Sequence, residues 1–323
     1  MGKTIPRLTQ SQAAQIRTCN QALTKPLHRP SSVVKRLFTI PFSSSPNTKL
    51  SILARCSSFN PHWIQRNLNK TLSLGTARTR SNTPLICSLK DIALYKSAGG
   101  DFHFLKKTGY LANYTRARIP NANSASTDNL LIARMALYQS LTGKTPDQAR
   151  ESLLLLFSRY LAGYGPASIQ DFSQWSGFPL KYCNQLSLLS SPLIFPVSIE
   201  GLKGSFFLHR RYQTGINHTA APPSVCILPK FDPYLSGYRN KNVIFDMPVL
   251  WNSDRPKLNL TSIILFKGQV IARWQMRSIR KNIEFIVRPF WTLSQYQNTT
   301  LETEFKSIAY CLGAKQHAFR IKN

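Results

Sequence analysis

The sequence predicts an α+β protein, and three observations lead to this class. Apolar residues recur at helical spacings between residues 8 and 40, and further helices with clear start signals follow between 146 and 189. After residue 225 the chain changes to short alternating apolar runs, which are typical of strands. With 323 residues, of which 42% are hydrophobic, the chain can form two or three units with buried cores.

The first hundred residues are expected to form a small helical unit. Residues 8–23 carry apolar side chains at mixed helical spacings, and those of 32–40 lie on one helical face. Pro41 is expected to end the second helix, and the Ser- and Pro-rich run 42–48 is typical of a loop. A further helix is expected to begin near Pro61, because proline suits the first turn.

Three helices and a hairpin are expected in the middle of the chain. A Thr-Pro-Asp-Gln start signal precedes a helix over 146–163, and Ser168 with Asp171 can cap the next helix. Pro179 opens a third helix, and residues 193–211 then alternate like two strands around a glycine-containing turn. Three helices followed by a two-stranded hairpin indicate a winged helix-turn-helix unit.

The last hundred residues are expected to be rich in strands. Thr299 and Glu302 form a capping-box signature for a final helix over 301–312, ended by Gly313. A small antiparallel sheet or barrel is the interpretation of this region. Its expected strands are 225–228, 243–250, 260–266, 270–276 and 283–290, with a turn at Lys267-Gly268-Gln269.

These elements together predict tandem winged-helix units followed by a C-terminal antiparallel β-barrel-like domain. A polar tract with several glycines and a run of Asn and Ser separates the two helical units and is typical of a linker. The expected segments are an N-terminal helical or winged-helix-like unit, a linker, a winged-helix domain and a C-terminal β-rich domain, at 1–98, 99–129, 130–222 and 223–323.

Charge is the strongest global signal in the composition. The chain has 42 Lys and Arg against 13 Asp and Glu, which gives a net charge of +29. Dispersed cations favour a polyanion, either nucleic acid or an anionic membrane, and the sequence has no convincing amphipathic anchor. The aliphatic run Leu153–Leu156 is far shorter than the roughly 20 residues that span a bilayer. Nucleic acid is therefore the expected partner. The alternative is that the basic surface only keeps the protein soluble.

Cysteine and histidine spacing gives no metal or cofactor site. The six cysteines and six histidines are scattered, which argues against zinc and against a disulfide framework and favours reduced thiols in the cytoplasm. No glycine-rich nucleotide loop and no Ser or Cys nucleophile motif is present. We expect no metal, no cofactor and no membrane association. A bacterial protein of this kind would be associated with the nucleoid.

Three sequence blocks carry a resemblance to a known family. The block YLAGYGPAS at 160–168, with its continuation to 177, the block LPKFDPYLSGYR at 228–239 and the hairpin GQVIARW at 268–274 occur in the family's order and spacing. The chain thus resembles the winged-helix proteins related to AlkZ, the crosslink-unhooking alkylpurine DNA glycosylases. The resemblance covers 145–313 strongly and 8–95 weakly.

This resemblance implies a cradle of tandem winged helices for double-stranded DNA, closed by a barrel-like domain. It also implies cleavage of the bond between an alkylated purine and its sugar. A polar pair supports that reaction in the family: a Gln, an apolar residue, and a second Gln or an Asp. The pair stabilises the cationic sugar and orients the attacking water.

The positions that match this pair read Pro41-Phe42-Ser43 in this chain. Proline offers no side-chain hydrogen bond, and Ser43 is too short to reach where a Gln amide would. The family also has an Arg, a Thr and a His nearby, and the matching residues here are Ser81, Thr83 and Leu85. We therefore assign no catalytic residue and expect the family's usual chemistry to be lost.

Three carboxylates are the possible substitutes for a residue that orients water. They are Asp91, Asp101 and Asp232. Asp232 lies in a turn, where a carboxylate more often accepts hydrogen bonds from nearby backbone amides, so a structural role is favoured for it.

Cations on elements that the resemblance turns toward the cradle are the expected DNA contacts. Phosphate contacts of this kind predict binding that depends steeply on salt and weakly on sequence. The aromatic residues of the matching blocks suit core packing better than base stacking. The expected contacts are Lys35, Arg36, Arg55, Arg78, Arg80, His209, Arg210, Arg211, Arg239, Lys241, Arg273 and Arg277, and the expected core aromatics are Tyr164, Trp175, Tyr234, Tyr238 and Trp274.

Three functions stay open from the sequence. The leading one is a duplex-DNA-binding protein on a repair-glycosylase scaffold that lacks base excision. The first alternative is an active glycosylase that excises N7-alkylpurines or unhooks interstrand crosslinks. The second is a winged-helix transcriptional regulator, which would prefer one sequence strongly over bulk DNA.

Overall fold

A computed structural model gives the fold of the chain. The described residues are 5–42, 46–60, 62–64, 74–78, 84–98, 103–104, 146–188, 192–212, 224–241, 244, 261–279 and 281–322. The expected strand at 243–250, apart from Ile244, and the expected linker at 99–129, apart from 103–104, lie outside these residues.

The fold mixes helices and sheets, which confirms the predicted α+β class. In the N-terminal region a four-stranded antiparallel sheet in the order β2-β4-β3-β5 is joined by short helices. Its elements are α1 (Gln10–Asn20), α2 (Pro30–Leu37), β2 (Thr39–Pro41), α3 (Asn47–Leu53), β3 (Leu74–Arg78), β4 (Pro84–Ser88), α5 (Leu89–Ser97) and β5 (His103–Phe104).

Two expectations for this region are wrong. The second helix ends at Leu37 and not near Ile40, because Phe38 takes a φ of 68°, which no helix continues. The next three residues form strand β2, and helix α3 begins at Asn47, inside the expected loop at 42–48. Ile40 is buried in the strand as it would have been in a helix. Apolar spacing over so few residues therefore cannot distinguish a strand from a helix.

The middle region has the predicted order of three helices and a hairpin. Ser168 and Asp171 cap α9 reciprocally, as predicted, and Gly177 ends that helix with a φ of 76°. The third helix is shorter than predicted, since α10 gives way to a 3₁₀ turn after Cys183. The elements are α8 (Pro146–Tyr164), α9 (Ile169–Ser176), α10 (Leu180–Cys183), η1 (Asn184–Leu188), β6 (Ile194–Ile199), β7 (Phe206–His209) and η2 (Arg210–Tyr212).

A strand from the start of the chain extends the hairpin. Strand β1 (Arg7–Leu8) pairs in parallel with β6, which gives a sheet in the order β1-β6-β7. This pairing joins residues nearly 200 positions apart. The local apolar pattern that predicts the hairpin carries no information about it.

The C-terminal region is an open sheet covered by a helix. The sheet order is β12-β11-β10-β9-β8, so its two outermost strands differ and the described residues form no closed barrel, contrary to expectation. On one face Phe305 packs against Phe285 and Trp274, with ring centroids 4.6 and 5.4 Å apart. The elements are β8 (Val225–Leu228), α11 (Pro233–Ser236), β9 (Ser262–Phe266), β10 (Gln269–Ile279), β11 (Asn282–Pro289), α12 (Gln295–Cys311) and β12 (Gln316–Ile321).

The terminal helix begins earlier than predicted. Ser294 caps α12 in a capping box with Gln297, whereas Thr299 donates its hydroxyl to the Gln295 carbonyl within the helix. Strand β12 was not predicted and pairs in parallel with β11. Its residues are half-buried or exposed, so they lack the apolar alternation that marks a strand in a sequence.

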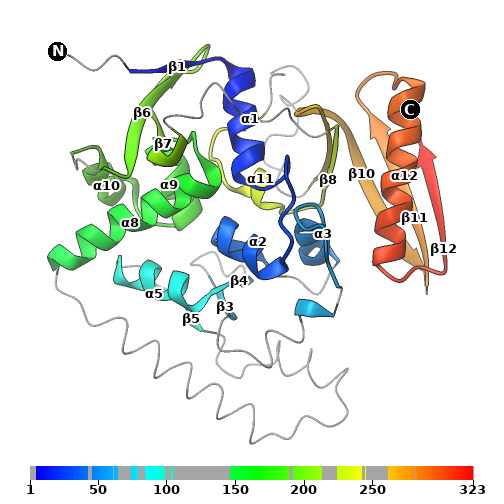
Figure 1. Cartoon of the computed structure of the whole chain (residues 1–323), viewed down its shortest axis with the longest axis horizontal. Coiled ribbons are helices and arrows are strands. Elements are labelled where there is room, and N and C mark those ends of the chain that lie inside the picture. Colours follow the sequence, from blue (N-terminus) through cyan, green and yellow to red (C-terminus); the bar gives the residue numbers. More distant parts are fainter. Residues whose placement is uncertain are drawn as a thin grey trace, which may run out of the picture.

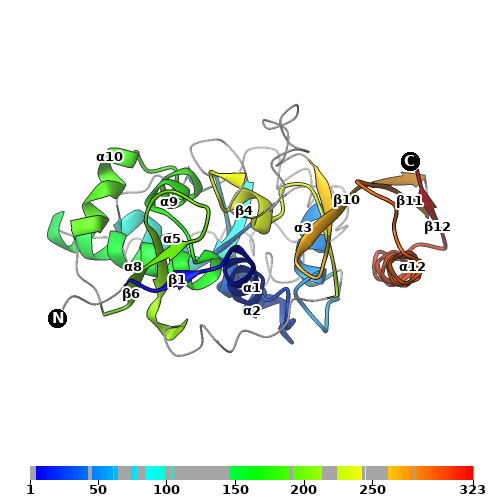
Figure 2. The same cartoon turned by 90° about the horizontal axis from the view of Figure 1, so that it is seen from above.

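The largest buried cluster joins all three regions of the chain. It includes residues of α1, α8, α9, β6, β8 and α11. Figures 1 and 2 show α1 and α2 between the α8–α10 group on one side and the C-terminal sheet with α12 on the other. Among the described residues no helix has both the length and the apolar character needed to cross a membrane.

Candidate nucleic-acid interface

The two glycine-containing motif blocks meet in the core. The Tyr160 hydroxyl donates to the Gly237 carbonyl at 2.7 Å, and the Tyr238 hydroxyl donates to the Tyr164 carbonyl at 2.8 Å. A Cβ atom at Gly237 would lie 2.3 Å from the ring of Tyr164, so only glycine fits there. Base stacking by these tyrosines is excluded because they are buried. The predicted core role is confirmed, with Trp175 half-buried, for Tyr164, Trp175, Tyr234, Tyr238 and Trp274.

Helix α1 binds the same junction through a buried arginine. Arg17 donates from Nε and Nη2 to the Pro166 carbonyl at 3.0 and 2.7 Å, and its guanidinium lies 5.4 Å from the centre of the Tyr238 ring. Asn20 donates to the Gly165 carbonyl at 2.7 Å. These donors satisfy carbonyls just after the end of α8, where a positive charge is also favourable. The matching sequence blocks thus form a structural junction.

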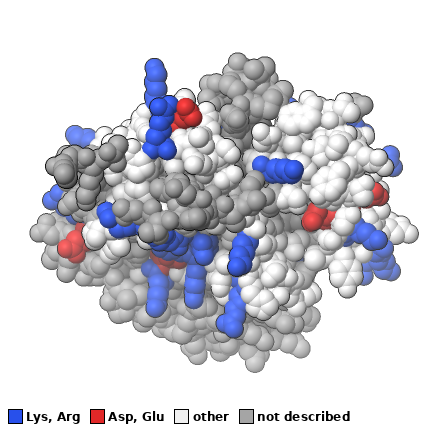
Figure 3. Space-filling view, turned by 45° about the horizontal axis from the view of Figure 1, so that its top comes forward, with Lys and Arg blue, Asp and Glu red and all other residues white. Residues whose placement is uncertain are grey.

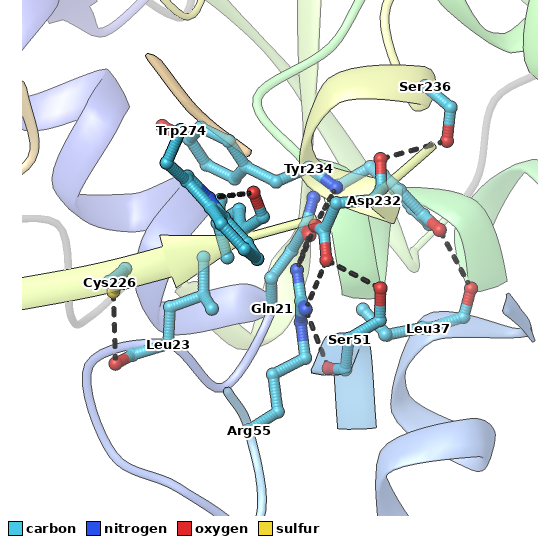
Figure 4. A network of polar contacts seen from close by, with 12 residues as sticks. Gln21, Leu23, Leu37, Ser51, Arg55, Cys226, Asp232, Tyr234, Ser236 and Trp274 are labelled. Atoms are coloured by element: carbon cyan, nitrogen blue, oxygen red, sulfur yellow. Dashed lines mark hydrogen bonds and ion pairs between the residues drawn. The ribbon is translucent and has the colours of Figure 1, made fainter. Parts of the chain in front are cut away.

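Arg55 and Asp232 form a buried ion pair at this junction (Figure 4). Two guanidinium nitrogens of Arg55 donate to the two carboxylate oxygens at 2.6 and 2.9 Å, and both side chains are 0% exposed. Asp232 also accepts from Ser51 Oγ and from the Tyr234 amide, each at 2.8 Å. The structural role predicted for Asp232 is confirmed. The DNA contact predicted for Arg55 is wrong, because a fully buried guanidinium cannot reach a phosphate.

The positions matching the family's polar pair lie on a packed strand. Pro41 is the direct cross-strand partner of Leu85, so two positions that the resemblance assigns to one site do lie side by side. Phe42 is buried in the adjoining core, and the Pro41 carbonyl accepts a hydrogen bond from Thr48 at 2.8 Å. None of these three side chains at 41, 42 and 85 has a donor or acceptor. The remaining positions, Ser43, Ser81 and Thr83, lie outside the described residues.

Asp91 lies in helix α5, which directly follows strand β4, and its carboxylate has partners within the fold. It lies in the first turn of α5, accepts from Ser88 Oγ at 2.7 Å and pairs with Arg159 Nε at 3.4 Å. Burial raises the pKa of Asp91 above its ordinary value, and the nearby Arg159 and Ser88 partly offset this. Asp101 lies outside the described residues. Across those residues no three His, Cys, Asp or Glu side chains lie close enough to hold a metal ion.

Cations gather where α2 and α8 meet. Helix α8 approaches α2 so closely that a Cβ at Gly163 would lie 2.7 Å from the Arg36 carbonyl. Arg159 donates to that carbonyl at 3.3 Å, and Arg211 donates to the Ala162 carbonyl on α8. Lys and Arg side chains are seen gathered near the middle of the face in Figure 3. We call this group the α2–α8 basic patch, and its members are Lys35, Arg36, Arg159, Arg210 and Arg211.

The charges within this patch act on one another. Burial, and then the positive charges of Arg36 and Arg159, lower the pKa of Arg211 below its ordinary value. Lys35 and Arg210 are exposed and Arg36 is half-buried, so the patch is open to a large ligand. Guanidinium groups that cluster at a surface repel one another, and the phosphates of a nucleic-acid backbone can neutralise them and accept their hydrogen bonds.

His209 and Lys241 differ from the expected surface cations. Burial, and then the charge of the neighbouring Arg211, lower the pKa of His209 below its ordinary value, so this imidazole takes up a proton less readily than an exposed one. Lys241 Nζ donates to the Leu235 and Tyr238 carbonyls, and burial lowers its pKa to about 8. The DNA contact predicted for Lys241 is therefore wrong, because its ammonium group is directed into the fold.

The other expected contacts are spread over two sheets and a turn. Arg239 and Arg277 are exposed, and the half-buried Arg273 guanidinium lies 5.4 Å from the centre of the Phe290 ring. For Arg78 the structure describes only the strand backbone, and Arg80 lies outside the described residues. For Arg239, Arg273 and Arg277 the DNA contact stays a prediction.

Sequence reasoning missed Arg159, a central member of the patch. It lies on α8 between the buried residues Phe157 and Tyr160. A cation at such a position on an otherwise apolar helix face was the available signal. Long charged side chains at helix edges place their stem on the core and their charge at the surface.

Comparisons with known proteins find similarity to AlkZ and related DNA glycosylases. A family model described as "DNA glycosylase AlkZ-like" matches residues 114–310. An interstrand DNA cross-link repair glycosylase from Streptomyces sahachiroi is 23% identical over 180 residues, which are 54% of this chain and 46% of that protein. The sequence match therefore spans about half the length of that relative. The solved structure of the Streptomyces sahachiroi DNA glycosylase AlkZ has a TM-score of 0.70 and 17% identity, and covers 98% of this chain and 100% of that one.

Proposed function

This chain belongs to the AlkZ-like DNA glycosylase family, and from that membership we propose that it binds duplex DNA without carrying out the family's base excision. The observation that carries the proposal is the apolar strand pair at the catalytic positions. Pro41 and Leu85 face each other, with Phe42 buried beside them. A base-excision site needs a polar group that orients water or stabilises the sugar cation.

The two helical regions are winged-helix units in this proposal. Helices α8, α9 and α10 with the β6–β7 hairpin have the order of a winged helix-turn-helix, and α1 to α3 with the β2–β4 strands form a second, less regular unit. Segments 1–98, 130–222 and 223–323 act as the units of one cradle, and 99–129 links the first two. The shared buried core supports a cradle of fixed shape.

DNA binds through its phosphates at the α2–α8 basic patch. Each neutralised phosphate releases counterions, so the logarithm of the binding constant falls with the logarithm of salt by about 0.9 per contact. Exposed cations on α2 and η2 suit phosphate contacts, which position a duplex and carry no sequence information. Binding is therefore weakly selective for sequence.

Family membership favours an active glycosylase as the second candidate, and one experiment separates the two. The purified full chain is incubated with duplexes carrying N7-alkylguanine or an interstrand crosslink, and strand scission after base treatment is measured. The Streptomyces sahachiroi glycosylase serves as the positive control. We expect salt-sensitive binding and no abasic sites above the protein-free level. Catalytic base release would overturn the proposal.

A variant that restores the amide side chains tests whether their absence explains the loss of base excision. Pro41→Gln with Ser43→Gln returns amide groups to both matching positions. Base release by this double variant, and not by the parent chain, would attribute the loss of excision to these two side chains. A strong preference for one DNA sequence would instead favour a transcriptional regulator.

A further inference from the structure

A second cationic feature lies in the C-terminal sheet. A pocket of about 330 Å³ opens beside the β9–β10–β11 ladder. Its volume lies at the lower end of the range for small-ligand sites, about 300 to 1,000 Å³. The described residues that line it are Lys230, Thr261, Ser262, Arg273, Trp274, Gln275, Arg288, Pro289 and Phe290.

The pocket holds like charges opposite each other. Arg273 on β10 and Arg288 on β11 are direct cross-strand partners, and Lys230 adds a third cation to the lining. No carboxylate occurs among the described lining residues. Like charges directly opposite on a sheet are destabilising, so this arrangement favours an anion between them.

The strands hold these cations in a fixed geometry. Trp274 lies next to Arg273 and donates from Nε1 to the Leu228 and Ile263 carbonyls at 3.0 and 3.2 Å. This ties β10 to β8 and β9. The Arg273 guanidinium lies over the Phe290 ring. A guanidinium beside an aromatic ring still presents its N–H donors at its edge, where an oxyanion can accept two of them.

We propose that this pocket binds a phosphate group, with Arg273 and Arg288 as the donors that contact its oxygens. Lys230 supplies further charge, and Gln275, two residues along β10 on the same face as Arg273, offers a neutral amide. The phosphate is a backbone phosphodiester or terminal phosphate of a nucleic acid, or a small phosphate compound. The site does not depend on the loss of base excision, nor on the α2–α8 basic patch.

Inorganic phosphate is the first probe, used with the full chain by calorimetry at constant ionic strength. Arg288→Gln removes one exposed guanidinium, and Arg273→Gln with Arg288→Gln removes both members of the pair. Lys306→Gln with Lys315→Gln removes two exposed charges on and just after α12 and is the matched control. We expect saturable phosphate binding that weakens at least tenfold in both pocket variants and less than twofold in the control.

The midpoint of thermal unfolding is a second measurement, and it distinguishes a variant that has lost the phosphate site from one that is misfolded. In chloride buffer Arg288→Gln should unfold at the same temperature as the parent chain or higher, because repulsion is relieved. Replacing chloride with phosphate should raise the midpoint of the parent chain and of the control more than that of the pocket variants, which keep only the stabilisation by phosphate as a salt and at other cations. Equal stabilisation of all variants, or no saturable binding to the parent chain, would overturn the proposal.

Duplexes with 5′-phosphate and 5′-hydroxyl ends then identify the source of the phosphate. Equal weakening of both duplexes in Arg288→Gln indicates a backbone phosphodiester. Loss of a preference for the 5′-phosphate duplex indicates a terminal phosphate. Unchanged DNA affinity together with lost phosphate binding indicates a small phosphate compound. Each of these results also leaves the duplex-binding proposal separately testable at the α2–α8 basic patch.

Discussion

The motif junction and the α2–α8 basic patch use arginine in opposite ways. At the junction Arg17 and Arg55 are 1% and 0% exposed, and their donors are directed at carbonyls and at the carboxylate of Asp232. In the patch Arg159 and Arg211 lie beside other cations and reach the surface. The first arrangement is closed within the fold. In the second, Arg159 has the internal partner Asp91, and the exposed Lys35 and Arg210 are the cations that the proposed function assigns to phosphates.

This difference separates family membership from activity. The blocks that identify the family, around Tyr164 and Gly237, belong to the junction, where a close fit restricts which residues are tolerated. The strand carrying Pro41 belongs to a smaller core, in which Ile40 and Phe42 pack with apolar residues of α2 and α3. The residues that identify the family and the positions that match its catalytic pair therefore lie in different buried clusters.

Breaking the junction should have the largest effect. Asp232→Asn leaves the guanidinium of Arg55 buried without a full counter-charge, and removal of one partner of a buried pair costs about 3 to 5 kcal/mol. Urea unfolding of the variant and the parent chain measures this loss. The control is Glu200→Gln, which breaks an ion pair whose side chains are 71% and 55% exposed and should cost less than about 1 kcal/mol. Equal losses in the two variants would contradict a structural role for the junction.

Much of the fold could be predicted from local signals. The capping pair Ser168 and Asp171, the order of three helices and a hairpin, and the strands around Gly268 all follow from patterns of a few residues. Strands β1 and β12 could not be predicted, since both pair in parallel with distant partners and have little apolar alternation. Their formation is decided by tertiary contact.

The candidate site was predictable to a lesser degree. The loss of the polar pair at 41 and 43 is visible in the sequence, but the pairing of Pro41 with Leu85 needs the sheet register. Arg55 was assigned to DNA because sequence gives a cation's sign and not its burial. Only the structure distinguishes a guanidinium with an internal carboxylate from one open to a phosphate.

Neutralising the exposed part of the patch should have a moderate effect. Lys35→Gln with Arg210→Gln removes two exposed cations and leaves the junction untouched. If each contacts one phosphate, the salt exponent for duplex binding falls by about 1.8, at about 0.9 per contact. Fluorescence anisotropy at several salt concentrations measures the exponent. An unchanged exponent, or an equal fall in the Lys306→Gln and Lys315→Gln control, would place the duplex elsewhere.

The smallest effect concerns His209, which lies between the two extremes of burial. Its Nδ1 accepts from the Arg211 amide at 3.2 Å, and burial with the charge of Arg211 lowers its pKa below the ordinary value of 6.5. Below pH 6.5 the unfolded chain therefore binds the proton more readily than the folded chain, so the free energy of unfolding falls with falling pH. His209→Gln should remove this component.

The measurement is the difference in unfolding free energy between the parent chain and His209→Gln from pH 7.5 to 5.5. The difference should decline through the acid range, whereas His317→Gln, on the exposed edge strand β12, controls for loss of an imidazole. A flat difference would contradict the half-buried environment of His209. Adding duplex DNA should reduce the decline, because a phosphate beside Arg210 and Arg211 stabilises the protonated imidazole. A smaller decline in the presence of DNA would tie the protonation of His209 to the patch, since a phosphate bound elsewhere would leave the pH dependence unchanged.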